Sequence, residues 1–182
     1  MSSDPEGLPP HPDLQRLARR GAEHLARFIL TLADDDNGIG AYVRAFMAGD
    51  NVAETRKLLE AEMNDIREGE REYDYRHRRG DVHLRRVDHL LDAIELVVLP
   101  ADPHAAFELV TQLIEGDGQV AEHAGDAWLQ PTYERAGELW LLAAKAVPTM
   151  EAERVRNRLN ASDDYGLRGR LSDQSAGGRT GR

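Results

Sequence analysis

The sequence predicts an all-α protein, a single antiparallel array or bundle of six or seven helices. Apolar residues recur at spacings of three and four along most of the chain, which is the period of one helix face. No stretch alternates apolar and polar residues with the period of two that is typical of strands. Short segments rich in Gly, Pro and Asp separate the helical stretches, and short connections place neighbouring helices antiparallel. The same pattern is compatible with a short solenoid of helical hairpins.

The first helix is predicted to begin at Asp13, which can cap it, and to end before Gly38. Its apolar face is formed by Leu14, Leu17, Ala18, Ala22, Leu25, Phe28, Ile29 and Leu32. A short helix follows and ends at Gly49, and its apolar side consists of Tyr42, Val43, Phe46 and Met47. These two helices form the predicted start of the array.

The middle of the chain carries the clearest start signals. Asn51 with Glu54 three residues later resembles a capping box. Asp81 can cap a further helix that Pro100 is expected to stop. Asp102 followed by Pro103 is a capping acid before a proline at the first helical position. The helix that begins there is expected to reach Gly116 with its apolar residues inward, namely Ala106, Phe107, Val110, Leu113 and Ile114.

The last two predicted helices are bounded by prolines. Pro131 opens one and Pro148 closes it, with Tyr133, Ala136, Trp140 and Ala143 on the inner face. Thr149 can cap a final helix that carries Val155 and Leu159. From Gly166 onward the chain is rich in Gly, Ser and Arg, a composition typical of disorder. We therefore predict a disordered segment at 1–12, one helical domain at 13–165 and a disordered tail at 166–182.

The composition excludes several kinds of chemistry. The 182 residues suit one domain, and the absence of cysteine excludes disulfides, Cys-type zinc fingers and thiol catalysis. The N-terminus lacks the apolar core of a signal peptide, and no apolar run is long enough to span a membrane. We therefore expect a soluble, cytoplasmic protein. The net charge of −10 argues against direct nucleic-acid binding and permits a basic protein partner.

The stretch DDDNGIGAYV, residues 34–43, resembles a calcium loop at first glance. If Gly38 is position 6 of such a loop, position 1 is Ala33 and position 12 is Arg44. Both positions require oxygen ligands, so the stretch is better interpreted as a turn between helices. Gly38 or Gly40 would then supply the left-handed conformation at the helix exit.

No other motif predicts a metal, a cofactor or a catalytic residue. The histidines form neither HxxxH nor HExxH, and nucleophile elbows and Gly-rich phosphate loops are absent. The nearest set of ligands on one helix face is His89 with Asp92 and Glu95, for which a solvated, ion-paired face is the preferred interpretation. We therefore predict no catalytic, cofactor or metal site.

The densest charge cluster is residues 67–86, in which seven arginines, five acids and two tyrosines interleave. Since the acids largely cancel the positive field, ion pairs along a helix surface are preferred over contact with nucleic acid. Arg and Tyr are enriched at binding hot spots, which makes the cluster a candidate protein-binding surface. Trp128 can anchor a partner or staple helices, whereas Trp140 belongs to the core. The candidate partner-binding residues are Tyr73, Tyr75, Arg76, Arg78, Arg79 and Trp128.

Residues 90–127 and 160–171 resemble an uncharacterised bacterial family of α-helical-repeat proteins, a domain of unknown function. The resemblance is carried by Pro100, Asp102 and Pro103, by the turn Asp117–Gly118, and by Asp164 to Leu167. Some members carry a SWIM-type zinc finger, which this chain lacks because it has no cysteine. The resemblance implies a helical fold and no activity.

We therefore expect a non-catalytic helical scaffold that mediates protein–protein interaction. The alternative is an acidic inhibitor or antitoxin-like protein that masks a basic nucleic-acid-binding surface. A charge-driven complex weakens steeply with salt and an apolar one does not, so the salt dependence of binding separates the two functions.

Overall fold

The computed structural model describes residues 19–35, 37–48, 51–68, 79–124, 129–163, 165–169 and 171. Within these ranges every regular element is a helix, which confirms the all-α prediction. The α-helices are α2 (Ala22–Asp35), α3 (Asn37–Ala48), α4 (Val52–Glu68), α5 (Arg79–Ala93), α6 (Leu99–Ala101), α7 (Pro103–Glu115), α8 (Asp117–Ala124), α9 (Gln130–Ala143) and α10 (Thr149–Ala161). A π-helical turn, Ile94–Val98, joins α5 to α6, and a 3₁₀ turn, Ala144–Ala146, follows α9.

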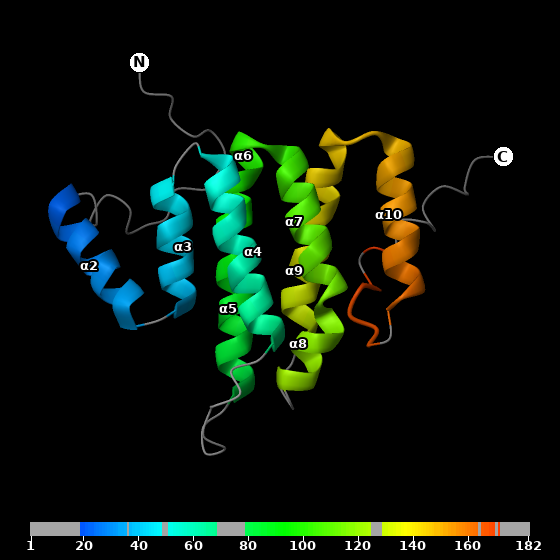
Figure 1. Ribbon diagram of the computed structural model, residues 1–182, viewed down its shortest axis with the longest axis horizontal. Helices are drawn as coiled ribbons and strands as arrows, with labels where there is room; N and C mark the ends of the chain where they lie inside the picture. The colour runs from blue at the N-terminus through cyan, green and yellow to red at the C-terminus, as the bar shows by residue number, and fades with distance from the viewer. Residues whose placement is uncertain are drawn as a thin grey trace.

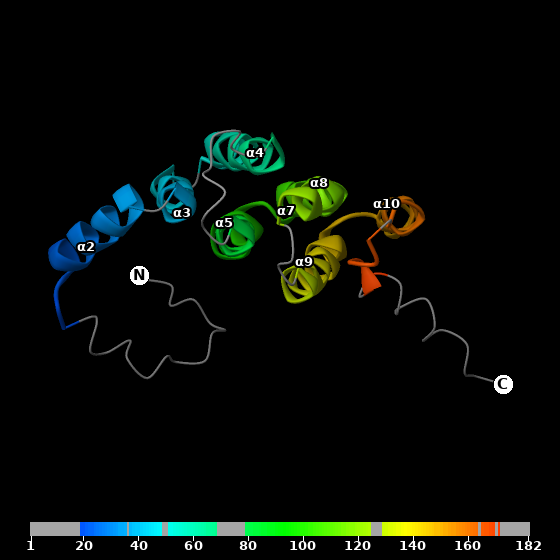
Figure 2. The same cartoon turned by 90° about the horizontal axis from the view of Figure 1, so that it is seen from below.

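The long helices lie side by side and alternate in direction (Figure 1). Seen from below, α4 and α7 form one layer and α5 and α9 the other, with α2 and α3 at one end and α10 at the opposite end (Figure 2). Both views agree with the predicted antiparallel array. The order follows from the short connections, because a turn of a few residues returns the chain beside the helix that it has just left.

The buried core lies between the two layers. Trp140 is 1% exposed, its ring centroid lies 5.1 Å from that of Phe107, and its Nε1–H donates to Thr111 Oγ1 at 2.8 Å. The inward residues predicted for α7, α9 and α10 are all buried. The helix periodicity therefore identified these faces correctly.

Two predicted caps are present. Glu54 N–H donates to Asn51 Oδ1 at 3.2 Å, and Asn51 Nδ2 donates to Glu54 Oε2 at 3.0 Å. Asp102 Oδ1 accepts from Ala105 N–H at 3.0 Å, so this acid caps α7 as predicted. The expected cap at Asp81 is wrong, since α5 begins two residues earlier and contains Asp81.

Pro100 does not end the helix before it. The helix continues to Ala101 through the π turn, in which Leu99 N–H donates to Ile94 O, five residues back. Proline has no N–H and clashes with the carbonyl four residues earlier, and the wider π turn directly before Pro100 accommodates it. The chain leaves the helical region at Asp102, where φ is −148° and ψ is 91°.

The start of the array differs from the prediction. The helix predicted from Asp13 to before Gly38 is interrupted, because 19–20 form a turn and Gly21 has φ +85°. Gly38 and Gly40 lie inside α3, so the expectation that one of them adopts a left-handed conformation is wrong. Gly40 has a different role. A Cβ there would lie 2.9 Å from the carbonyl oxygen of Ala33, so the close approach of α3 to α2 requires glycine.

The packed part of the chain extends beyond the predicted domain boundary at 165. Leu167, Arg168 and Leu171 are at most 7% exposed, so the segment that was expected to begin a disordered tail contributes to the core. The sequence also did not predict α8, which is only eight residues long. Residues 1–12 and 172–182 lie outside the described residues.

Candidate functional site

The predicted partner-binding residues fall almost entirely outside the described chain. This applies to Tyr73, Tyr75, Arg76, Arg78 and Trp128. Arg79 is the first residue of α5, and only its backbone is described. The binding role of these residues stays a prediction.

At the C-terminal end of the charge cluster, Arg85 is exposed as expected for a solvated face, whereas Arg86 is buried. Arg86 is 6% exposed on α5. Its Nε donates to Glu62 Oε1 of α4 at 2.7 Å, and its Nη2 donates to Asp65 of the same helix. The ion pairs that were expected to run along one helix therefore connect two helices here.

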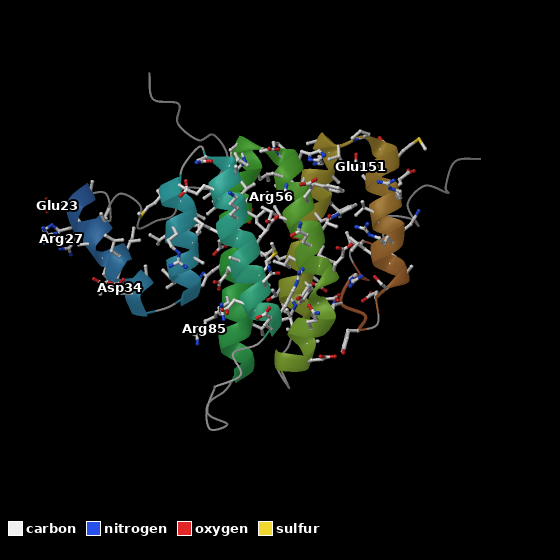
Figure 3. All side chains as sticks on the ribbon, in the orientation of Figure 1. Glu23, Arg27, Asp34, Arg56, Arg85 and Glu151 are labelled. Carbon is white, nitrogen blue, oxygen red and sulfur yellow. The ribbon has the colours of Figure 1, made fainter. Side chains whose placement is uncertain are left out.

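Arginines connect other pairs of helices in the same way. Arg135 of α9 donates to Asp92 Oδ1 at 2.6 Å and to Glu95 Oε2 at 2.8 Å. Arg56 of α4, labelled in Figure 3, pairs with Glu108 of α7. Arg158 of α10 pairs with Glu115 of α7 at 2.6 Å. In each of these pairs, an arginine of the protein itself balances the negative charge of the carboxylate.

The helix face with His89, Asp92 and Glu95 is one of these bridged surfaces. His89 Nδ1 lies 3.8 Å from Asp92 Oδ2, but Arg135 lies between the two carboxylates and supplies the cation that balances them. Among the described side chains, no group of three His, Asp or Glu residues has a geometry that could hold a metal ion.

The two turn motifs of the family resemblance meet in space, although about fifty residues separate them. Arg168, 4% exposed, donates from Nε and Nη2 to the two carboxylate oxygens of Asp117, 3% exposed, both at 2.7 Å. This is a bidentate pair, the strongest form of a charge-assisted hydrogen bond between side chains. Arg168 Nη1 donates to Leu159 O at 2.5 Å and to Ser162 Oγ at 2.8 Å. The guanidinium therefore holds α8, the end of α10 and the following turn together.

The turn that carries Arg168 is shaped by its own sequence. Asp163 accepts from the backbone N–H groups of Leu167 at 3.0 Å and Arg168 at 3.2 Å. Gly166 has φ +67°, a left-handed conformation that costs little only for glycine. These features direct Arg168 inward, and they explain the need for Asp163 and for glycine at 166 in this turn.

Both glycines around Asp117 are closely packed. A Cβ at Gly116 would overlap the Arg67 guanidinium, whose Nη2 donates to Gln112 O. A Cβ at Gly118 would lie 3.1 Å from the Tyr165 ring. A cavity of about 500 Å³ opens beside this junction, and it is lined by Arg67, Gln112, Glu115, Asp117, Gly118, Gln119, Glu122, Ser162, Tyr165 and Arg168.

The Tyr133 hydroxyl is a buried polar group in this region. It finds no hydrogen-bond partner among the described residues. Burial raises the pKa of the Tyr133 phenol, and the negative charge of Asp117 raises it further. Both effects favour the neutral form of the hydroxyl. The charged groups of the junction are engaged with one another, which supports a structural role for it.

The second notable feature is an exposed apolar surface at the opposite end of the array. Ten large apolar side chains of the described chain are exposed, and six of them lie on α2 and α3. These six residues, which we call the α2–α3 surface, are Phe28, Ile29, Leu30, Leu32, Phe46 and Met47. Residues 22–34 of α2 include no buried residue, although their apolar residues follow a helix period. Phe46 and Met47, which were expected to face inward, are 66% and 69% exposed.

The surroundings of α2 explain its exposure. Figure 2 shows α2 at the end of the array, with α3 as its neighbour among the described helices. Glu23, Arg27 and Asp34 project from its outer side in Figure 3, and Glu23 pairs with Arg27 at 2.8 Å. None of the described helices combines the length and the apolarity needed to cross a bilayer.

A family model, described as a family of unknown function (DUF6880), matches residues 13–174. The chain belongs to the DUF6880 family. The match includes both turns of the Asp117–Arg168 junction, and it covers the segment beyond 165 that packs into the core. No curated protein and no solved structure matches this DUF6880 chain. The predicted resemblance to a family of unknown function is therefore confirmed, and membership assigns no activity.

Proposed function

We propose that this DUF6880 protein is a non-catalytic helical scaffold that binds another protein through the α2–α3 surface. The observation that carries the proposal is the concentration of six exposed, large apolar side chains on two adjacent helices. Apolar surfaces of this kind mark interaction sites. The terminal element of a helical array usually presents a polar outer face. Helix α2 carries exposed charged side chains, but it also exposes Phe28, Ile29, Leu30 and Leu32.

The proposed partner presents an apolar helix face on a protein of net positive charge. A partner helix on α2 would extend the array with the same side-by-side packing that α2 has with α3 (Figure 2). The net charge of −10 favours the approach of a cationic protein and raises its association rate. The apolar side chains would supply the affinity that persists at high salt.

The acidic inhibitor or antitoxin-like function has less support. An inhibitor that mimics nucleic acid must offer unpaired carboxylates to a basic surface. In the described chain Glu62, Asp92, Glu95 and Asp117 are instead paired with arginines of neighbouring segments. These pairs reduce the negative charge that is free to attract a partner.

The test compares three forms of the full chain as baits in a lysate of the source cells, washed at low and high salt. They are the wild type, the double variant Phe28→Asp/Phe46→Asp, and the control Met150→Asp, whose side chain is 83% exposed on α10 at the other end. A partner recovered at high salt is then purified and titrated by calorimetry. We expect the double variant to raise Kd at least about thirtyfold, the effect of losing one hot spot of about 2 kcal/mol. The control variant is expected to bind like the wild type.

Three results would contradict the proposal. Equal affinity of the wild type and the double variant would place binding elsewhere. A partner that is a basic nucleic-acid-binding protein, retained only at low salt, would support the inhibitor function instead. Substrate turnover by the purified protein without any partner would exclude the non-catalytic role.

A further inference from the structure

We propose that two copies of this chain associate through α2, with the two helices antiparallel about a twofold axis beside Phe28 and Ile29. These two side chains are 62% and 43% exposed, and α2 lies at the end of the array of described helices (Figure 2). The occupant of this apolar side is a second copy of the chain. The inference goes beyond the proposed function, because the dimer requires no other protein.

The first support is the symmetry of the apolar pattern. Leu25, Phe28, Ile29 and Leu32 share one side of α2. Their positions are symmetric about the midpoint of Ala22–Asp35, which lies between Phe28 and Ile29. An antiparallel second copy centred there places Leu25 opposite its Leu32, and Phe28 beside its Phe28. Each apolar side chain therefore meets another one, and the same surface serves both copies, as twofold symmetry requires.

The second support is the distribution of charge along α2. Arg19 and Arg20 are exposed directly before the helix, and Asp34 is exposed in its last turn. This order is the reverse of what the helix macrodipole favours. In an antiparallel pair, the basic start of each helix lies near the acidic end of the other, so the charges of the two copies are complementary.

The balance of charge near α2 also permits self-association. The whole chain carries −10, but residues 19–35 contain three arginines and three acidic residues, so this segment has no net charge. Glu23, Arg27 and Asp34 project from the outer side of α2 in Figure 3. Their spacing places them on a different side of the helix from Phe28 and Leu32. The apolar side can therefore be buried without the cost of burying a charge.

The size of the contact predicts a weak dimer. Helix α2 has 14 residues and is about 21 Å long. One such helix from each copy is a small contact compared with the roughly 1,200–2,000 Å² of a stable interface. We therefore expect a dimer that dissociates on dilution. A partner that binds at Phe28 then has to replace the second copy, and this last step rests on the proposed function.

Sedimentation velocity of the purified full chain tests the association. The salt concentration is about 0.15 M, where charges separated by more than about 8 Å are screened. We expect the average mass to rise from one chain toward two as the protein concentration increases. Phe28→Asp places two like charges beside the axis and should raise the dissociation constant at least about thirtyfold. Met150→Asp, at the other end of the array, should associate like the wild type.

Two results of this measurement would overturn the inference. One is a wild type that stays monomeric at every concentration. The other is equal association of the wild type and the Phe28→Asp variant, which would place the contact on another surface.

Disulfide cross-linking tests the antiparallel arrangement. Since the chain has no cysteine, single cysteines can be introduced cleanly, and a disulfide requires Cα atoms within about 7 Å. Phe28→Cys places a thiol beside the axis and should shift the chain to a covalent dimer under mild oxidation. Arg27→Cys places it on the outer side of α2 and should leave the chain largely monomeric. Equal rates of cross-linking in the two variants would also overturn the inference.

The purified protein alone separates this inference from the proposed function. If the wild type is monomeric and Phe28→Asp/Phe46→Asp nevertheless loses the partner, the proposed function stands and the dimer is wrong. If the dimer forms and the double variant binds the partner like the wild type, the dimer stands and the partner binds elsewhere.

Discussion

At the residue scale, this protein uses arginine to hold its helices together. Arg86, Arg135, Arg158 and Arg168 each connect a helix or turn to a different one. The planar guanidinium suits this role because its donors are fixed in a fork that matches a carboxylate. The energetic value of each bridge depends on its burial, since exposed pairs contribute little and buried pairs are costly to break.

The Arg168–Asp117 pair provides the sharpest prediction at this scale. Arg168→Ala leaves the Asp117 carboxylate buried without a partner, and we expect it to lower the free energy of unfolding by about 3–5 kcal/mol. Arg158→Ala removes an ion pair in which the arginine side chain is 61% exposed, and it should cost less than about 1 kcal/mol. Urea unfolding monitored by circular dichroism measures both. Equal effects of the two substitutions would show that the buried pair does not hold the junction.

A second prediction concerns Gly116. Gly116→Ala places a methyl group against the Arg67 side chain, and forcing that contact is expected to cost about 1–3 kcal/mol. Gly169→Ala is the matched control, because its Cβ would meet nothing within 4 Å. The thermal midpoints of both variants check this expectation. A Gly116→Ala protein as stable as the control would mean that Arg67 moves aside without cost.

At the element scale, side-chain caps and prolines determine where helices begin and end. Asp102 and Asn51 satisfy backbone N–H groups that have no partner within their own helices. The π turn before Pro100 shows the opposite case, in which a helix passes through a proline by widening rather than stopping. Both effects are local, yet only the caps could be recognised in the sequence.

The cap of α7 gives a prediction for this scale. We expect Asp102→Ala to lower the free energy of unfolding by about 1 kcal/mol, because Ala105 N–H loses its acceptor. Asp102→Asn retains an acceptor oxygen and should be close to wild type. Chemical denaturation of the three proteins measures the difference. If the alanine variant were no less stable than the asparagine variant, the hydrogen bond of the cap would not contribute to the free energy of unfolding.

At the scale of the whole molecule, the C-terminal turn completes the domain. Leu167 and Leu171 are buried at 7% and 1% exposure, and Arg168 connects them to α8. A chain that ends at 163 loses both leucines and leaves Asp117 unpaired. The domain therefore needs residues that the composition alone placed in a tail.

Truncation tests this conclusion. A chain ending at 163 should lose more than about 5 kcal/mol, from an unpaired buried charge and two buried leucines, which approaches the total stability of a domain. We expect it to be unfolded or to melt far below the full chain. A chain ending at 174, where the family match ends, should melt like the full chain. Calorimetry measures the melting temperature of both truncated proteins. Equal melting temperatures would show that the domain ends near 165 and that residues 165–171 do not stabilise it.

The sequence by itself determined the helical class, most helix positions and the inner faces of α7, α9 and α10. It did so because helix periodicity and capping depend on residues three or four positions apart, which the sequence displays directly. It also contained the two turns of the Asp117–Arg168 junction, although as separate motifs. Composition misplaced the domain boundary, since burial of Leu171 depends on what packs against it.

Only the tertiary structure decided which charges are paired and which apolar faces are exposed. Arg86 and Arg135 appear in the sequence as members of charged helix faces, and their partners come from other helices. Phe28 carries the same pattern as a core residue, and it is exposed on α2, which lies at the end of the array of described helices (Figure 2). Phe46 is exposed on α3 although other residues of that helix are buried. Periodicity reveals that a helix has an apolar side, but contact with a neighbour depends on residues distant in sequence, and that contact decides whether the side is buried or exposed.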